Sequence, residues 1–374
     1  MKKILHIIPS VSAGGIESLV VSLYENIDRE KYQFDFAVFN PNNPIHKKRL
    51  EELGAEIYFI ADAGSKSNLL SKISWRIKAL YNFFRLVSKN DYDVLHCHNY
   101  NGYNLYILLA ALKGIPTRIV HSHSTNDDRK SFLVKVSNKL KKLFSFNWLI
   151  TSKLACSKMA AEWLYGKDSV LEDPKTRVIY NGINMNKFSS ENKNIKKIRE
   201  KYEINDGIHF INVGRFSHPK NQLFLLDVFY ELTKNKKKVF LHIVGYGSLE
   251  KKLKNKVKEL NLENKVTFYK YNTDIPELLS VMDFFLLPSN FEGLPITAIE
   301  AQASNLPIYM SKEITKEVDM GLATYLPLEK GAKYWVDYIL KDIANNTYPK
   351  KIDLEKKKIF DIENVAKEFE KLYD

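Results

Sequence analysis

The chain has 374 residues, of which 45% are hydrophobic and 27% are charged, and its formal net charge is +13. This length favours two domains, and this composition excludes an intrinsically disordered protein. No apolar run reaches the roughly 18 residues that a membrane-spanning helix needs, and the first residues predict a buried strand, not a signal peptide. The positive charge fits a nucleic acid, an anionic lipid or a phosphorylated substrate as partner.

The first half alternates short apolar strands with longer helical patterns. The strands are expected at residues 4–8, 34–39, 57–60, 94–97, 118–121 and 149–156, and the helices at about 16–27, 69–88 and 101–113. Strands that lack polar alternation and are spaced by helices predict a parallel sheet covered on both faces. Cys97 and Cys156 lie in two of these strands without a CxxC pattern, so we expect reduced core cysteines of a cytosolic protein.

A pair of glycines, Gly14 and Gly15, follows the first strand. Glycines at a strand-to-helix turn let the backbone approach a phosphate and point N–H groups at it. A plain tight turn explains the pair equally well.

Two His-x-His pairs end later strands, His96 with His98 and His121 with His123. Alternate residues of a strand point the same way, so each pair has the spacing to chelate a metal. Neither pair has an acidic or cysteine ligand beside it. We therefore expect one histidine of the second pair to line a cleft, where it bonds a substrate hydroxyl or transfers a proton.

Residues 129–146 combine lysines and arginine with apolar residues that approximate one helical face. A basic amphipathic helix fits an anionic membrane surface. A core helix with a solvated lysine face fits the same pattern.

Residues 189–201 are polar and lysine-rich, as in an exposed connection, and the alternation then restarts with strands at 209–213, 239–244, 266–269, 284–287 and 307–310. The sequence thus predicts an α/β fold of two Rossmann-like, doubly wound domains that face each other across a cleft. Ligands of such sheets bind beyond the carboxyl ends of the strands. We expect the domains at residues 1–185 and 186–357, with a final helix at about 358–374 that packs back on the first domain.

Two cationic side chains follow the first strand of the second half. Arg215 comes after Gly214, and Lys220 lies near the start of the next helix. A fixed guanidinium and an ammonium stabilise the charge of a departing diphosphate. A second glycine-containing turn contains Gly245 and Tyr246, and the segment 268–274, with Thr273, either wraps a nucleobase or is a simple loop.

Glu292 and Glu300 enclose seven residues that include a Gly-Leu-Pro turn. Pro295 suits the first turn of a helix, whose unpaired N–H groups can bind a phosphate. Two carboxylates can then flank a nucleotide-sugar. An ordinary strand–loop–helix unit with two solvated glutamates is the alternative.

With these motifs the chain resembles the retaining GT-B glycosyltransferases of family GT4 over nearly its whole length. The resemblance rests on Gly14-Gly15, Gly214-Arg215 with Lys220, Gly245-Tyr246-Gly247 and the E-x7-E motif from Glu292 to Glu300. Phrases such as Gly-Gly-Ile-Glu-Ser and Phe-Glu-Gly-Leu-Pro are most similar to exopolysaccharide-cluster transferases of the EpsF or capsular type.

The resemblance implies how the E-x7-E segment binds a nucleotide-sugar. Glu292 would contact hydroxyls of the transferred sugar, and Glu300 would accept from the ribose hydroxyls. The backbone of Gly293, Leu294 and Pro295 would lie beside the sugar and the phosphates. Relatives often have glycine where this chain has Asn305, which tolerates the left-handed conformation of a helix C-cap, so we expect the cap to persist.

The resemblance also assigns the charged and histidine positions. Arg215 and Lys220 would bind the diphosphate, and Gly14-Gly15 would close on it from the other domain. The histidine in the cleft matches His121 or His123, and we favour His123. No metal and no other cofactor is expected.

The expected activity is transfer of a hexose or N-acetylhexosamine, with retention, from a nucleoside-diphosphate sugar to a polyprenyl-linked or oligosaccharide acceptor. A UDP-sugar is favoured over a GDP-sugar. The setting would be capsule or exopolysaccharide synthesis in the bacterial cytoplasm, peripheral to the inner face of the membrane. The alternatives are a GT-B sugar-nucleotide epimerase and a nucleic-acid-binding protein, the latter suggested only by the charge.

Overall fold

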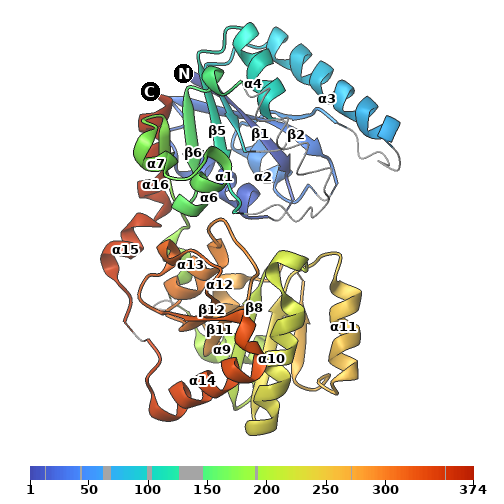
Figure 1. The fold of residues 1–374 in the computed structure, drawn as a ribbon, viewed down its shortest axis with the longest axis vertical. Coiled ribbons are helices and arrows are strands. Elements are labelled where there is room, and N and C mark those ends of the chain that lie inside the picture. The colour runs from blue at the N-terminus through green and yellow to red at the C-terminus, as the bar shows by residue number, and fades with distance from the viewer. Residues whose placement is uncertain are drawn as a thin grey trace. The chain divides into compact units, whose positions relative to one another are not determined.

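The computed structural model describes residues 1–12, 14–42, 44–61, 69–98, 103–125, 146–189, 193–270, 272–349 and 351–374. The basic segment predicted at 129–146 therefore lies outside the described residues, except for Phe146. The chain forms two compact units: unit 1 contains Met1–Gly182 and Ile362–Asp374, and unit 2 contains Ile183–Asp361 (Figure 1). The sequence analysis placed the boundaries after residues 185 and 357, and these units divide after Gly182 and Asp361.

Unit 1 is built on a seven-stranded parallel sheet in the order β3-β2-β1-β4-β5-β6-β7. The strands are β1 (Lys2–Ser10), β2 (Tyr32–Asn40), β3 (Ile57–Phe59), β4 (Val94–Cys97), β5 (Thr117–Ser122), β6 (Ser152–Ala155) and β7 (Thr176–Val178). The strand expected at 149–156 is shorter, because η1 (Asn147–Leu149) is a 3-10 turn. The Thr151 hydroxyl then accepts the N–H of Arg118 at 2.8 Å before β6 begins.

Helices cover both faces of this sheet. They are α1 (Gly15–Asn26), α2 (Lys47–Glu52), α3 (Leu69–Lys89), α4 (Tyr103–Leu112), α6 (Lys158–Tyr165), α7 (Ser169–Glu172) and, from the end of the chain, α16 (Ile362–Tyr373). α1 and α16 pack with one apolar core, to which α16 contributes Val365, Phe369 and Tyr373. α3 and α4 pack with a second core that contains Phe83 and Ile107.

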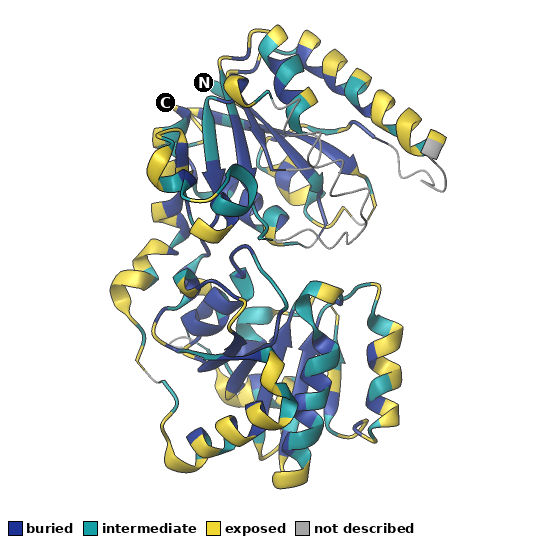
Figure 2. Cartoon of the chain, viewed as in Figure 1, coloured by how far each residue is buried: buried dark blue, intermediate teal, exposed yellow. Residues whose placement is uncertain are grey.

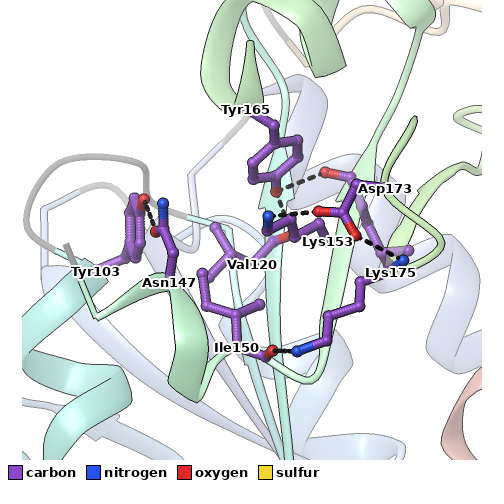
Figure 3. Close-up of polar contacts among 9 residues, drawn as sticks. Tyr103, Val120, Asn147, Ile150, Lys153, Tyr165, Asp173 and Lys175 are labelled. Atoms are coloured by element: carbon purple, nitrogen blue, oxygen red, sulfur yellow. Dashed lines mark hydrogen bonds and ion pairs between the residues drawn. The ribbon is translucent and has the colours of Figure 1, made fainter. Parts of the chain in front are cut away.

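Polar contacts fasten the last strands of unit 1 (Figure 3). The Tyr165 hydroxyl lies 2.6 Å from the carbonyl oxygen of Val120 and 2.9 Å from that of Leu154. Lys153 Nζ lies 2.6 Å from Asp173 Oδ2, and its hydrogen bond lowers the pKa of the Asp173 carboxyl. These contacts hold α6 and the loop before β7 against β5 and β6.

Unit 2 contains a six-stranded parallel sheet in the order β10-β9-β8-β11-β12-β13. Its strands are β8 (Ile208–Val213), β9 (Val239–Val244), β10 (Val266–Tyr269), β11 (Phe284–Leu287), β12 (Ile308–Ser311) and β13 (Ala323–Leu326). The predicted α/β class, with one Rossmann-like sheet in each half, is confirmed. In unit 2 the strand order reverses between β8 and β11, the position at which doubly wound sheets bind ligands.

The elements around the second sheet include three short 3-10 turns. The helices are α8 (Met185–Phe188), α9 (Ile195–Lys201), α10 (Gln222–Asn235), α11 (Glu250–Glu259), α12 (Ile275–Leu279), α13 (Ile296–Ala303), α14 (Gly331–Asn345) and α15 (Leu354–Ile359), and the turns are η2 (His218–Lys220), η3 (Lys316–Val318) and η4 (Leu328–Lys330). In the part of the chain that the structure describes, no helix combines the length and the apolar character needed to cross a bilayer.

Candidate functional site

The loops that follow β8 and β11 meet at the reversal of strand order in unit 2. The backbone N–H of Asn290 donates to the Pro219 carbonyl at 2.7 Å, and the Asn290 side-chain amide donates to the His218 carbonyl at 2.8 Å. These bonds hold the loop before α13 against η2. They bring Lys220, at the end of η2, next to the E-x7-E segment.

Lys220 and Glu292 form an ion pair. Lys220 Nζ lies 2.6 Å from Glu292 Oε1, and the two side chains are only 18% and 13% exposed. The Ser289 hydroxyl donates to the same carboxylate oxygen at 2.8 Å. Gly214 gives the lysine room, because a Cβ there would lie 3.2 Å from Lys220 Cε. The ammonium is thus fixed at the carboxyl end of the sheet, where an anionic ligand would bind.

Glu300 lies near the same ammonium. Burial of the Glu300 carboxyl raises its pKa to about 7, and the charge of Lys220 opposes that rise. One cation therefore acts on both glutamates of the motif, although eight positions separate them in the sequence. Near neutral pH the Glu300 carboxyl is able to gain or lose a proton.

The start of α13 differs in detail from the expectation. Pro295 occupies the N-cap position and Ile296 is the first helical residue, so the proline directly precedes the first turn. The hydroxyl oxygen of Thr297 is buried and has no hydrogen-bond partner among the described residues. Buried hydroxyls are normally paired. Thr297 was not predicted, and only its place in the first turn, three residues before Glu300, could have drawn attention to it.

The helix that carries Glu300 ends as expected. Asn305, which follows α13, has a φ of 60°, the left-handed conformation that asparagine tolerates. The expected cap is therefore retained without glycine.

The glycine turn after β9 packs against the loop after β8. The N–H of Gly214 donates to Val244 O at 3.0 Å, and the N–H of Phe216 donates to Tyr246 O at 2.8 Å. A Cβ on Gly245 would lie 2.1 Å from the carbonyl oxygen of Gly214. Glycine at position 245 is therefore required for the close approach of the two loops.

Two further predicted residues lie on loops at this edge of the sheet. Arg215 is exposed, and its guanidinium carbon lies 6.0 Å from the centre of the Tyr246 ring. Thr273 lies between β10 and α12, where its N–H donates to Lys270 O at 3.1 Å. The roles expected for these two residues stay predictions.

In unit 1 the glycine pair adjoins a buried acid that the sequence analysis did not anticipate. Glu17 is 5% exposed, and Ser10 Oγ donates to its Oε1 at 2.5 Å. A Cβ on Gly14 would lie 2.3 Å from Glu17 Oε2, so Gly14 makes room for this carboxylate. A carboxylate in the first turn of a helix is stabilised by the helix dipole. The Glu17 carboxylate therefore already supplies a negative charge at the N-terminus of α1.

The predicted histidines belong to a cluster of five. Its fifth member is His6 on β1, which the His-x-His spacing did not reveal. The contacts are His6 Nδ1 to His98 Nε2 at 3.0 Å, His98 Nδ1 to His123 Nε2 at 2.9 Å, His96 Nε2 to His121 Nδ1 at 3.2 Å, and His96 Nδ1 to the Tyr373 hydroxyl at 2.8 Å. His123 alone keeps an intermediate exposure, while His121 is fully buried.

Burial lowers the pKa of every histidine in the cluster. The pKa of His6 and that of His123 fall to about 3, and the other three lie well below 6.5. All five are therefore neutral at neutral pH. Two triads, His6 with His96 and His98, and His98 with His121 and His123, bring ligand nitrogens within 4.8 Å of one another. The ring nitrogens of these histidines already hydrogen-bond one another, so we interpret the cluster as a neutral hydrogen-bonded network.

Two families of known proteins match the two halves of the chain. The family described as "Glycosyltransferase Family 4" matches residues 13–187, and the family described as "Glycosyl transferases group 1" matches residues 192–318. Among curated relatives, EpsF of Bacillus subtilis (strain 168) is 29% identical over 354 residues, or 92% of this chain and 88% of EpsF. The capsular polysaccharide biosynthesis glycosyltransferase CapH of Staphylococcus aureus is 28% identical over 385 residues, or 100% of this chain and 99% of CapH.

The descriptions of a third relative and of a solved structure include a substrate or a ligand. The UDP-Gal:alpha-D-GlcNAc-diphosphoundecaprenol alpha-1,3-galactosyltransferase of Escherichia coli is 26% identical over 316 residues, or 83% of this chain and 79% of the enzyme. The crystal structure of HepE from Anabaena in complex with UDP-glucose matches with a TM-score of 0.78 and 18% identity, covering 100% of this chain and 99% of HepE. The structural match shows the fold, and the family descriptions do not favour the epimerase or nucleic-acid alternatives.

Proposed function

This chain belongs to the family 4 and group 1 glycosyltransferases of the GT-B fold, and from that premise we propose which molecules it joins. Its donor is a UDP-sugar that carries a hexose or N-acetylhexosamine, and its acceptor is a polyprenyl-linked or oligosaccharide glycan. The sugar is transferred with retention and without a metal, in capsule or exopolysaccharide synthesis.

The observation that carries the proposal is the environment of Lys220. Its ammonium is held by Glu292 at 2.6 Å at the carboxyl end of the unit 2 sheet, and it interacts with Glu300. A donor diphosphate is a stronger competitor for an ammonium than one carboxylate is, because it carries more charge. When the sugar leaves, the same ammonium stabilises the diphosphate without moving.

Other groups of unit 2 complete the proposed binding of the donor. We assign the nucleotide to the neighbourhood of the unpaired Thr297 hydroxyl and the Glu300 carboxyl, which are three residues apart on α13. Glu292 orients the transferred sugar, and Arg215 adds a second positive charge. We assign no nucleophilic role to Glu292, since the acceptor hydroxyl attacks from the face that the diphosphate leaves.

The relatives support the choice of substrates. The names of HepE's ligand and of the Escherichia coli donor both contain UDP, which supports a uridine nucleotide. The same Escherichia coli enzyme uses a diphosphoundecaprenol-linked acceptor by its name, which supports a polyprenyl-linked glycan. CapH supports a place in capsule synthesis.

A donor screen tests the substrate class. UDP-sugars and GDP-sugars are compared by the thermal stabilisation that they give to the protein. The hit is then incubated with a polyprenyl-diphosphate-linked glycan, with and without a chelator, and the anomeric configuration of the product is read by NMR. We expect stabilisation by UDP-sugars, transfer that survives the chelator, and a retained configuration. Turnover of the donor without any acceptor would contradict transfer.

Substitution of Glu292 tests the assignment of the site. Glu292→Gln should lower kcat by about 100-fold, in the range seen when one charge-stabilising group is removed, while changing the affinity for UDP much less. Lys220→Ala should weaken UDP binding about tenfold or more, because a bond to a charged group is lost. Lys251→Ala, an exposed position on α11, is the matched control. Full transferase activity in Glu292→Gln would remove Glu292 from the site.

A further inference from the structure

α3 lies on the outside of unit 1, beside α4 (Figure 1), and has exposed residues along its length (Figure 2). Its inner face contributes Ala79, Phe83, Leu86 and Val87 to the core. A helix at the surface of a soluble domain normally needs only this one apolar stripe, with polar residues opposite it. The opposite face of α3 does not follow that rule.

Five large apolar side chains project outward from α3. They are Leu70, Ile73, Ile77, Tyr81 and Phe84, which are 77%, 45%, 62%, 58% and 39% exposed. Their spacing is three or four residues throughout, which places them in one row along the helix. Single exposed apolar residues are common, but a continuous row of this length marks an interaction surface.

The same helix carries only positive charge. Its cations are Lys72, Arg76, Lys78, Arg85 and Lys89, and no aspartate or glutamate occurs from Leu69 to Lys89. Two cations contact aromatic rings of the apolar row. Arg85 Cζ lies 5.8 Å from the centre of the Tyr81 ring, and Nζ of Lys113, which follows α4, lies 4.4 Å from the centre of the Phe84 ring. We call these five apolar and five cationic residues of α3 the α3 surface.

We propose that the α3 surface docks unit 1 onto an anionic lipid bilayer. The apolar row enters the boundary between headgroups and acyl chains, and the cations pair with lipid phosphates while their aliphatic stems remain against the apolar layer. A second copy of the chain is a poorer occupant, because a symmetric contact would bring two uniformly cationic helices together. An acidic peptide would satisfy the cations but leave the row of five apolar side chains less well covered than a bilayer does.

This inference goes beyond the proposed reaction and needs no donor site. It assigns the lipid contact to described residues of α3, whereas the sequence placed it at 129–146. Docking would hold the protein where a polyprenyl-linked acceptor is found. Vesicle binding, measured without donor or acceptor, therefore succeeds or fails independently of the transferase activity.

Cosedimentation with vesicles tests the proposal. Vesicles of phosphatidylglycerol and phosphatidylcholine in equal parts should bind the protein, vesicles of phosphatidylcholine alone should bind it at least tenfold less, and added salt should weaken binding. Lys72→Glu with Arg85→Glu should lower binding more than tenfold, since two charges that attract an anionic surface are replaced by two that it repels. Ile77→Ser with Tyr81→Ser should also lower it severalfold.

Matched substitutions elsewhere serve as controls. Leu171→Ser changes an equally exposed leucine, 76% exposed on α7, and Lys251→Glu with Lys252→Glu reverses two exposed lysines of α11. Both should bind vesicles like the unchanged protein. All variants should keep the urea unfolding midpoint of the unchanged protein, which shows that they fold.

A local probe gives a second measurement. In Tyr81→Trp, the emission gained over that of the unchanged protein, which has four tryptophans, should shift to shorter wavelength with phosphatidylglycerol vesicles and be quenched by brominated lipid. The proposal is overturned if the α3 variants bind vesicles as the controls do, or if binding does not depend on the anionic lipid. It is equally overturned if Ile77→Ser with Tyr81→Ser instead abolishes self-association of a protein that binds no vesicles.

Discussion

Lys220 joins residues that the sequence keeps far apart. Its ammonium pairs with Glu292 and acts on Glu300 from another loop. The spacing of the two glutamates predicted that they share a site, but not that a lysine already neutralises one of them. A donor bound as we propose would displace or share the Lys220–Glu292 ion pair, and Glu292 would then affect both the orientation of the sugar and the charge that the diphosphate meets.

The raised pKa of Glu300 predicts a trade-off between stability and binding. Its pKa is about 7 in the folded protein against 4.5 for an unperturbed glutamate. The folded state therefore holds this proton more tightly, and stability is highest below pH 4.5 and falls as the pH rises to about 7. Glu300→Gln removes the cost of ionising the Glu300 carboxyl, and above pH 7 it should stabilise the unliganded protein by roughly 3 kcal/mol while weakening UDP binding.

Urea unfolding and UDP titration, each repeated across this pH range, measure the two effects. Glu263→Gln, a charge removal outside the site in unit 2, is the control and should change neither. A loss of stability in Glu300→Gln above pH 7 would show that the carboxylate is compensated in the folded protein.

His6 predicts a loss of stability in acid. Its pKa is about 3 in the folded state and 6.5 when unperturbed, so the unfolded chain binds the proton more readily. The stability that neutral His6 contributes is fully present above pH 6.5 and is lost as the pH falls towards 3, by about 1.4 kcal/mol per pH unit. Glutamine keeps hydrogen-bonding capacity and does not titrate, so His6→Gln should reduce the dependence of the unfolding free energy on pH by about that amount.

The measurement is urea unfolding at a series of pH values between neutrality and the onset of acid unfolding. His218→Gln, at an exposed histidine of unit 2, is the control and should keep the full dependence. Parallel curves for the unchanged protein and His6→Gln would mean that His6 becomes protonated in the folded state.

At the scale of elements, the loops after β8 and β9 form one interlocked unit beneath Lys220. Backbone bonds join Gly214 to Val244 and Phe216 to Tyr246. Glycine at positions 214 and 245 is therefore explained by the packing of these loops, in addition to any contact with a ligand. These glycines let two loops pack closely enough to fix the lysine.

Alanine at position 245 should disrupt this pair of loops. Its Cβ would lie 2.1 Å from Gly214 O, and the φ of Gly245 is +153°. We expect Gly245→Ala to cost roughly 3 kcal/mol through the overpacking and to abolish stabilisation by UDP. Gly331→Ala is the control, because Gly331 has a φ of +76° but nothing within 4 Å of an added Cβ, so its cost should stay at about 1 kcal/mol. Urea midpoints compare the two, and similar midpoints would contradict the close approach.

At the scale of the whole molecule, the chain returns to unit 1 at its end. α16 contributes Phe369 and Tyr373 to a core that includes residues of β1 and β2, and the Tyr373 hydroxyl bonds His96. The core of unit 1 thus includes residues that follow unit 2 in the sequence. α16 packs against the unit 1 sheet as the other helices of this unit do.

Phe369→Ala tests this dependence. Phe369 is fully buried, and removal of such a ring typically costs about 3–5 kcal/mol. Hydrogen exchange read by mass spectrometry should show faster exchange in β1, β2 and β4 and unchanged exchange in β8 and β9. Leu354→Ala, at a 64% exposed position on α15, should change neither set. Faster exchange in both sheets would mean that the two units unfold together.

The sequence by itself determined the two sheets, and it predicted most of the residues of the proposed donor site. Apolar runs spaced by helical patterns specify parallel sheets because period and length are local properties, and the E-x7-E segment lies on one strand–loop–helix unit. The tertiary structure decided what depends on residues distant in the chain: that His6 joins the four predicted histidines, that Lys220 pairs with Glu292, and that Tyr373 closes the histidine cluster. The tertiary structure also showed which apolar row of α3 faces outward. A helix with apolar residues on two faces does not by its sequence reveal which face packs against the core.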